Sequence, residues 1–121
     1  MKQCLIVDDS RSMRKIARVI LESLDFAVDE AEDGAAAINL CRHKMPDAIF
    51  LDGNLPDKSG LDFIRAVRRD PLGAKPVMVV CLIESEMAQI SEAIGAGANE
   101  YLLKPYDSDS VRAKFADTGL I

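Results

Sequence analysis

Short apolar runs alternate along this chain with longer segments whose apolar residues recur every three or four positions. The apolar runs predict β-strands at residues 3–8, 26–30, 48–51, 77–82 and 100–103. The periodic segments predict helices at residues 12–24, 34–43, 61–69, 86–96 and 109–117. Five strand-helix units in succession are typical of a parallel sheet that is covered by helices on both faces.

Charged side chains stand where three of the predicted strands end. Asp8 and Asp9 follow the first apolar run, Asp52 follows the third, and Lys104 follows the fifth. Ligands of open α/β sheets bind beyond the carboxyl ends of the strands, so we expect these four side chains to lie together. Three carboxylates beside a lysine form a pocket for a hard cation with a potential nucleophile. The pattern therefore indicates phosphoryl-transfer chemistry.

Composition narrows the class of protein further. The chain has 121 residues, of which 49% are hydrophobic, and this fits one globular domain. Its net charge of -5 argues against direct nucleic-acid binding. No apolar run approaches the roughly 20 residues of a membrane span, so we expect no membrane insertion and a cytoplasmic location. Cys4, Cys41 and Cys81 are odd in number and widely spaced, as expected for small core residues in a reducing compartment.

Three ordered motifs resemble those of the receiver domains of two-component response regulators, most closely the stand-alone chemotaxis-type (CheY-like) members. They are VDDS at 7–10 followed by Met13 and Arg14, LDGNLP at 51–56 followed by Gly60, and GANEYLLKPY at 97–106. Each motif alone is weak, but the set is specific and covers essentially the whole chain. The resemblance implies an α/β, flavodoxin-like (βα)5 fold with a doubly wound five-stranded parallel sheet in the order 2-1-3-4-5. It also implies a single receiver domain over residues 1–121 with no output domain.

The resemblance assigns roles to the residues at the strand ends. Asp52 matches the phosphoacceptor, whose carboxylate takes a phosphoryl group from a histidine kinase or a histidine phosphotransferase. Asp8 and Asp9 match the acidic pair that holds Mg²⁺ together with Asp52 and the backbone carbonyl of Asn54. Mg²⁺ keeps several waters and takes few carboxylates, so a site of this size suits it.

Further expectations follow from the same resemblance. Lys104 matches the lysine that pairs with the phosphoryl oxygens, and the peptide before Pro105 is expected to be cis, which would aim that lysine inward. We expect a monomeric signalling protein of a phosphorelay, not an enzyme with an external substrate, although it would catalyse its own phosphorylation and dephosphorylation. Its downstream protein target would bind the fourth helix, fifth strand and fifth helix.

One position departs from the family pattern. Receivers have a threonine or serine at the end of the fourth strand, where its hydroxyl bonds the phosphoryl group and its movement frees an aromatic residue of the fifth strand to turn inward. The ungapped count back from Lys104 places Leu82 at this position, and leucine has no donor. Tyr101 retains the aromatic half of the switch. Leu82 therefore lacks the hydroxyl on which the usual coupling depends, whereas the acids and the lysine are intact.

Three explanations of Leu82 are open. Phosphorylation survives with weak readout, or with readout by another element such as residues 82–85 or the surface around Tyr101 and Tyr106. A one-residue slip brings Cys81 to the site, which is disfavoured because it inverts the two faces of the strand. Otherwise the domain works mainly through protein contacts. We expect Leu82→Thr to strengthen the phosphorylation-dependent change.

Two nearby positions are expected to modulate the reaction. Gly53 follows the phosphoacceptor, and its missing side chain would leave an acyl phosphate open to water and speed self-dephosphorylation. Glu84 lies where side chains influence the same reaction, with a sign that the sequence does not give. By contrast, the cluster of Arg65, Arg68 and Arg69 is interpreted as a solvated basic face.

Other classes of function remain as alternatives. The main rival is a receiver-like scaffold or adaptor that works without phosphorylation. A Mg²⁺-dependent aspartyl-phosphate hydrolase is less favoured, because it typically has a second acid two residues after the nucleophile, where this chain has Asn54. A flavin-binding module would need a phosphate-cradling loop after the first strand, and Asp8 and Asp9 would repel phosphate there.

Overall fold

The computed structural model describes all 121 residues, and the strands and helices alternate as the sequence predicts. The strands are β1 (Lys2–Val7), β2 (Phe26–Ala31), β3 (Ala48–Asp52), β4 (Val77–Leu82) and β5 (Glu100–Leu103). The helices are α1 (Arg11–Ser23), α2 (Gly34–His43), α3 (Gly60–Arg69), a 3₁₀ helix η1 (Glu84–Gln89), α4 (Ile90–Ala96) and α5 (Ser108–Asp117).

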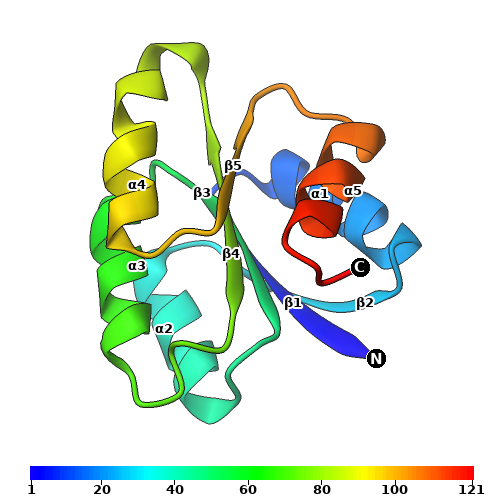
Figure 1. The fold of residues 1–121 in the computed structure, drawn as a ribbon. Coiled ribbons are helices and arrows are strands. Elements are labelled where there is room, and N and C mark those ends of the chain that lie inside the picture. The colour runs from blue at the N-terminus through cyan, green and yellow to red at the C-terminus, as the bar shows by residue number, and fades with distance from the viewer.

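The strands form one parallel sheet between two layers of helices. Their order is β2-β1-β3-β4-β5, which confirms the predicted doubly wound topology. Helices α2, α3 and α4 cover one face, and α1 and α5 cover the other (Figure 1). The chain crosses from one face to the other around the central β1 and β3, so the loops after these two strands meet at one point.

Each face of the sheet has its own hydrophobic core. Phe63 and Ile64 of α3 are fully buried on the α2-α3-α4 side, whereas Leu21 of α1 and Phe115 of α5 are fully buried on the α1-α5 side. All five residues of β3 are buried, as expected for a central parallel strand whose two faces are covered. This core holds the strand ends in fixed positions.

The predicted single helix over residues 86–96 is wrong. The segment is a 3₁₀ helix at Glu84–Gln89, followed by α4, which begins only at Ile90. No residue of the 3₁₀ helix is buried, so no apolar stripe holds it at the α-helical period. The Glu86 carboxylate instead accepts the Ile83 N–H at 2.9 Å, which closes this turn locally.

Arg68 is not part of a solvated basic face, as the sequence interpretation had it. Its guanidinium is partly buried and donates to the carbonyls of Gly97, Gly73 and Pro76 at 2.7–3.0 Å, and to Oδ1 of Asn99 at 3.0 Å. The end of α3 brings Arg68 within reach of otherwise unpaired loop carbonyls, and a guanidinium has five donors to offer them. Burial lowers its pKa. Arg68 thereby joins the loops that precede β4 and β5.

The remaining sequence expectations concern the cysteines and the membrane. Cys4, Cys41 and Cys81 are buried, unpaired thiols of the two cores. No helix in the structure has the length and apolar character that crossing a bilayer requires.

Candidate functional site

Three acidic side chains meet at the carboxyl edge of the sheet. Asp52 ends β3 and is 8% exposed, Asp8 directly follows β1 and is 6% exposed, and Asp9 is exposed beside it. One carboxylate oxygen of each lies within 4.8 Å of those of the other two. The strand-end pattern of the sequence thus brings these acids together as predicted.

Lys104, which directly follows β5, completes this acidic site. Its ammonium nitrogen donates to Asp52 Oδ1 at 3.0 Å, and its backbone N–H donates to the Leu82 carbonyl at 2.8 Å. The Lys104–Pro105 peptide is cis, as the family resemblance implies. Asp52 Oδ1 also accepts the Asn54 N–H at 3.2 Å. The phosphoacceptor candidate therefore has one oxygen engaged by two donors.

Asp8 is held in place by α1 as well as by its own strand. Its Oδ1 accepts the Ser10 N–H at 2.8 Å, and its backbone carbonyl accepts Arg14 Nη1 at 2.8 Å. Arg14 Nε donates in turn to Glu30 of β2 at 3.0 Å. The Arg14 side chain is mostly buried by these contacts, so it ties the end of β1 to both neighbouring elements.

The electrostatics of the site reflect its excess of negative charge. Burial raises the pKa of Asp8, and the Asp52 charge adds to this, against the Ser10 N–H and the Lys104 charge. Burial alone would lower the pKa of Lys104, but its hydrogen bond to Asp52 and the charges of Asp52 and Asp8 raise it above its usual value. Hard oxygen donors with surplus negative charge fit Mg²⁺, so Asp8, Asp9 and Asp52 are suitable ligands for it.

Leu82 points away from this acidic site. In the sheet ladder Asp52 lies opposite Cys81, and Leu82 lies opposite Leu103, so Leu82 takes the other face of the sheet. The side chain is 1% exposed and belongs to the α2-α3-α4 core. The β3–β4 and β4–β5 ladders are continuous, which leaves no register slip in β4.

The Leu82 side chain fills the space that a side chain at position 53 would need. A Cβ added to Gly53 would lie 2.4 Å from Leu82 Cδ2 and 3.1 Å from the Cys81 carbonyl oxygen. Gly53 is also buried, and its N–H donates to that carbonyl at 2.9 Å. The expected opening beside Gly53 is therefore absent, because Leu82 fills the volume that a larger side chain would take. Rapid self-dephosphorylation was expected because of this opening, so the structure removes the basis for that expectation.

The other two candidate modulating residues lie at the rim. Tyr101 of β5 is half-buried, with Lys114 Nζ of α5 4.7 Å from its ring centroid, and Lys114 also pairs with Glu100 at 3.1 Å. Glu84 is exposed at the start of the 3₁₀ helix. Tyr101 is the second residue of β5, Glu84 lies two residues beyond β4, and both are outside the cluster of acids.

Two uncharged residues lie beside the acids, although the sequence analysis considered Cys81 there only through a register slip and Tyr106 only as part of a readout surface. Cys81 shares the sheet face of Asp52, and burial, with the charges of Asp52 and Asp8, raises its pKa against the influence of Lys104. Tyr106 packs edge-on against Phe50 with ring centroids 5.2 Å apart, and burial raises its pKa. Strict alternation along β4 would have placed Cys81 on this face.

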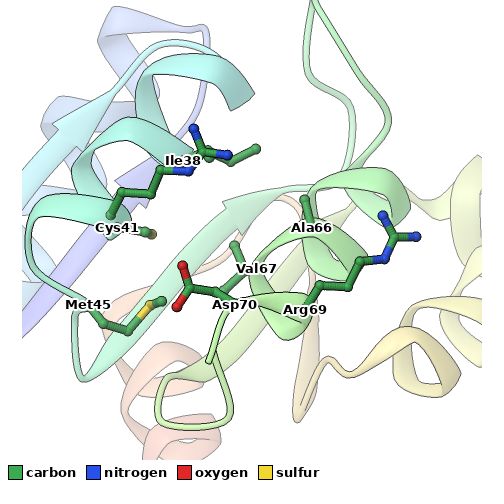
Figure 2. Close-up of a pocket in the computed structure, with 8 residues that line it drawn as sticks. Ile38, Cys41, Met45, Ala66, Val67, Arg69 and Asp70 are labelled. Atoms are coloured by element: carbon green, nitrogen blue, oxygen red, sulfur yellow. The ribbon is translucent and has the colours of Figure 1, made fainter. Parts of the chain in front are cut away.

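The largest cavity of the molecule is elsewhere. It measures about 330 Å³ and lies between the carboxyl-terminal halves of α2 and α3 (Figure 2). These helix ends are at the opposite end of the sheet from Asp52, which ends β3. It is lined by Ile38, Cys41, Arg42, Met45, Ala66, Val67, Arg69 and Asp70. Burial raises the pKa of the Cys41 thiol to about 11, so this cysteine is a poor nucleophile.

Comparisons with known proteins agree with this geometry. The sequence model of the response regulator receiver domain matches residues 4–116. The chemotaxis protein CheY of Pseudomonas aeruginosa is 38% identical over 112 residues, which cover 91% of this chain and 90% of that protein. CheY of Halobacterium salinarum is 33% identical over 116 residues, covering 96% and 95%. Among solved structures, chemotaxis response regulator CheY4 of Vibrio cholerae superposes with a TM-score of 0.90 at 26% identity, covering 97% of this chain and 98% of that one.

Proposed function

The chain belongs to the response regulator receiver domain family, and from this premise we propose that it is a phosphoacceptor that receives a phosphoryl group on Asp52. The observation that carries the proposal is the Lys104–Asp52 contact of 3.0 Å beside two further acids. A hydrolase is not favoured, since Asn54 stands where its second acid would be.

The proposed chemistry is a transfer between two covalent carriers. A carboxylate oxygen of Asp52 attacks the phosphorus of a phosphohistidine or of a small acyl phosphate, and forms an acyl-phosphate bond. The bond from phosphorus to the donor breaks, and its electron pair stays with the donor nitrogen or oxygen. Lys104 stays paired with the negative charge that moves onto the phosphoryl oxygens.

Mg²⁺ would be held by Asp8, Asp9, Asp52 and the backbone carbonyl of Asn54. When bound, it neutralises the charge on the phosphoryl oxygens and so permits an anionic carboxylate to approach them. The Ser10 N–H and Arg14 fix Asp8 at its position beside Asp52. Lys104 offsets part of the negative charge of the site before any cation enters.

Signalling would proceed through protein contacts on the α4-β5-α5 face. This face carries the half-buried Tyr101 and the exposed Ile94, which has 43% of its surface accessible. The phosphoryl donor would be a histidine kinase or a histidine phosphotransferase. A scaffold that works without phosphorylation is the second candidate, and the buried Leu82 at the switch position favours it.

Intact-protein mass after incubation with acetyl phosphate tests the proposal. We expect one added phosphoryl group that requires Mg²⁺ and is absent from Asp52→Asn. Asp62→Asn, which changes an exposed acid of α3, is the matched control and should be phosphorylated like the wild type. If neither acetyl phosphate nor a phosphorylated kinase adds mass to the wild type, the scaffold function is supported instead.

A further inference from the structure

The loop of residues 53–59 connects the phosphoacceptor strand to α3. Its base is closed by a hydrogen bond from the Gly60 N–H to the Gly53 carbonyl at 3.2 Å and by a β-bridge between Asn54 and Ser59. A Cβ on Gly60 would lie 2.8 Å from the Gly53 oxygen, so glycine is required for this closure. The loop begins directly after Asp52 and contains the proposed carbonyl ligand of Asn54.

The tip of the same loop is attached to a different helix. Both carboxylate oxygens of Asp57 accept backbone N–H groups from the first turn of α2, Gly34 at 2.9 Å and Ala35 at 2.9 Å. These two bonds lower the pKa of Asp57. They join residues 22 and 23 positions apart in the sequence, so they fix the loop against the rest of the domain.

Asp57 completes the cap of α2 together with Asp33. Asp33 Oδ1 accepts the Ala36 N–H at 2.7 Å, and its backbone carbonyl accepts the Ala37 N–H at 3.1 Å. The N–H groups of Gly34, Ala35 and Ala36, which lack partners within the helix, are thus all bonded, one by the Asp33 side chain and two by the loop, and the Ala37 N–H makes the first bond within the helix. Asp33 and Asp57 cap the same helix, but only Asp57 belongs to the loop after Asp52.

Side-chain packing supports the same attachment. The aliphatic stem of Lys58 lies over Gly34, where an added Cβ would be 2.7 Å from its Cδ and 2.8 Å from its Cγ. Gly34 is buried by this contact. The absence of a side chain on the first residue of α2 lets the loop approach closely enough for the Asp57 carboxylate to reach both N–H groups.

We propose that Asp57 is a positioning residue, which holds the loop of residues 53–59 on α2 so that the Asn54 carbonyl stays beside Asp52 in the geometry that Mg²⁺ requires. The inference rests on the proposed function and extends it to a residue outside the acidic site. Mg²⁺ demands near-octahedral geometry, so a loop free to move by a fraction of an ångström presents a poorer ligand.

Calorimetric Mg²⁺ titration of the wild type, Asp57→Ala and Asp33→Ala tests this inference. We expect Asp57→Ala to weaken Mg²⁺ binding by roughly tenfold, the low end for residues that hold metal ligands in place. Asp33→Ala, which removes a cap from the same helix, should change it less than about twofold. Asp57→Asn keeps one acceptor oxygen and should fall between them. Phosphorylation of Asp57→Ala by acetyl phosphate should be slow at low Mg²⁺ and recover at saturating Mg²⁺.

Amide hydrogen exchange without any metal supplies a second measurement. The Asn54 N–H should exchange faster in Asp57→Ala and remain at the wild-type rate in Asp33→Ala. Equal effects of the two variants on Mg²⁺ affinity and on Asn54 exchange would show that Asp57 is only a helix cap, and would overturn the inference alone. If the wild type itself binds no Mg²⁺, the proposed function fails and the inference with it.

Discussion

The carboxyl edge of the sheet has two adjoining regions that are built in different ways. The acidic site consists of polar groups, Asp8, Asp9, Asp52 and Lys104, whose hydrogen bonds and charges determine their positions. The switch region is Leu82 with Gly53 and Tyr101, and its geometry is set by packing. In the acidic site, the types of side chain present are enough to support a function. In the switch region, function depends on whether there is free space into which a side chain can move.

This difference teaches that the two steps of a receiver can be altered independently. The proposed phosphoryl transfer uses only the groups of the acidic site, whatever residue stands at the end of β4. Leu82, however, fills the space next to Gly53 and faces away from Asp52, so it neither bonds a phosphoryl group nor vacates a space by moving toward one. We therefore expect phosphorylation with a weak response at Tyr101.

The largest effect is expected when the packing of the switch region is changed. Leu82→Thr removes buried apolar volume and introduces a hydroxyl, which should lower the free energy of unfolding by about 2–4 kcal/mol. Urea denaturation measures this loss. Leu102→Thr, in the core on the other face of the sheet, is the matched control and should cost a similar amount. A cost below 1 kcal/mol for Leu82→Thr alone would mean that Leu82 is not tightly packed.

A double-mutant cycle tests whether Gly53 and Leu82 share one space. Gly53→Ala should lower the free energy of unfolding by about 1–3 kcal/mol, because the added methyl meets Leu82 Cδ2. In the Leu82→Thr background this cost should fall by about 1 kcal/mol or more, and in the Leu102→Thr background it should not change. Additive costs in both backgrounds would show that side chains at positions 53 and 82 do not compete for the same space.

For a substitution in the acidic site we expect a gain in stability, whereas the substitutions in the switch region should cause a loss. Asp8→Asn should raise the free energy of unfolding by about 1–2 kcal/mol at neutral pH without divalent cations, because it removes a buried charge. The raised pKa of Asp8 means that its ionised form is disfavoured in the fold. The wild type should therefore lose stability as pH rises through that pKa, and Asp8→Asn should lack this part of the loss. Unfolding curves from pH 3 to pH 8 measure both.

Mg²⁺ provides the control for this prediction. The cation should stabilise the wild type in proportion to its binding and should stabilise Asp8→Asn much less, which would reduce the difference between them. An Asp8→Asn protein that is less stable than the wild type in the absence of Mg²⁺ would contradict the view that the ionised form of the buried Asp8 is disfavoured in the fold.

The smallest effect concerns Tyr101. Lys114→Met removes the cation above the Tyr101 ring and the pair with Glu100, and should lower the free energy of unfolding by about 0.5–1 kcal/mol. If Leu82 is the restraint on the switch, Tyr101 should still not respond to phosphorylation in this variant. A response as large as that of Leu82→Thr would assign the restraint to Lys114 instead.

The sequence predicted the sheet and the acidic site because both depend on strong local signals. Apolar runs that end in Asp8, Asp52 or Lys104 encode the strand and its polar end together, and parallel topology gathers the ends. The 3₁₀ helix before α4 was missed because its residues have helical propensity but no buried face. The Gly53–Leu82 contact and the Asp57 bonds to α2 were missed because they join side chains and backbone of distant segments, which no period in the sequence encodes.

The Tyr101 ring resonances, recorded by NMR before and after phosphorylation with acetyl phosphate and Mg²⁺, test the central claim most directly. In the wild type we expect the backbone amides of Asp9, Asn54 and Lys104 to shift while the Tyr101 ring does not, and in Leu82→Thr we expect both to shift. A Tyr101 ring that shifts equally in both proteins would contradict the account, because Leu82 would then not separate the chemistry of the acidic site from its readout.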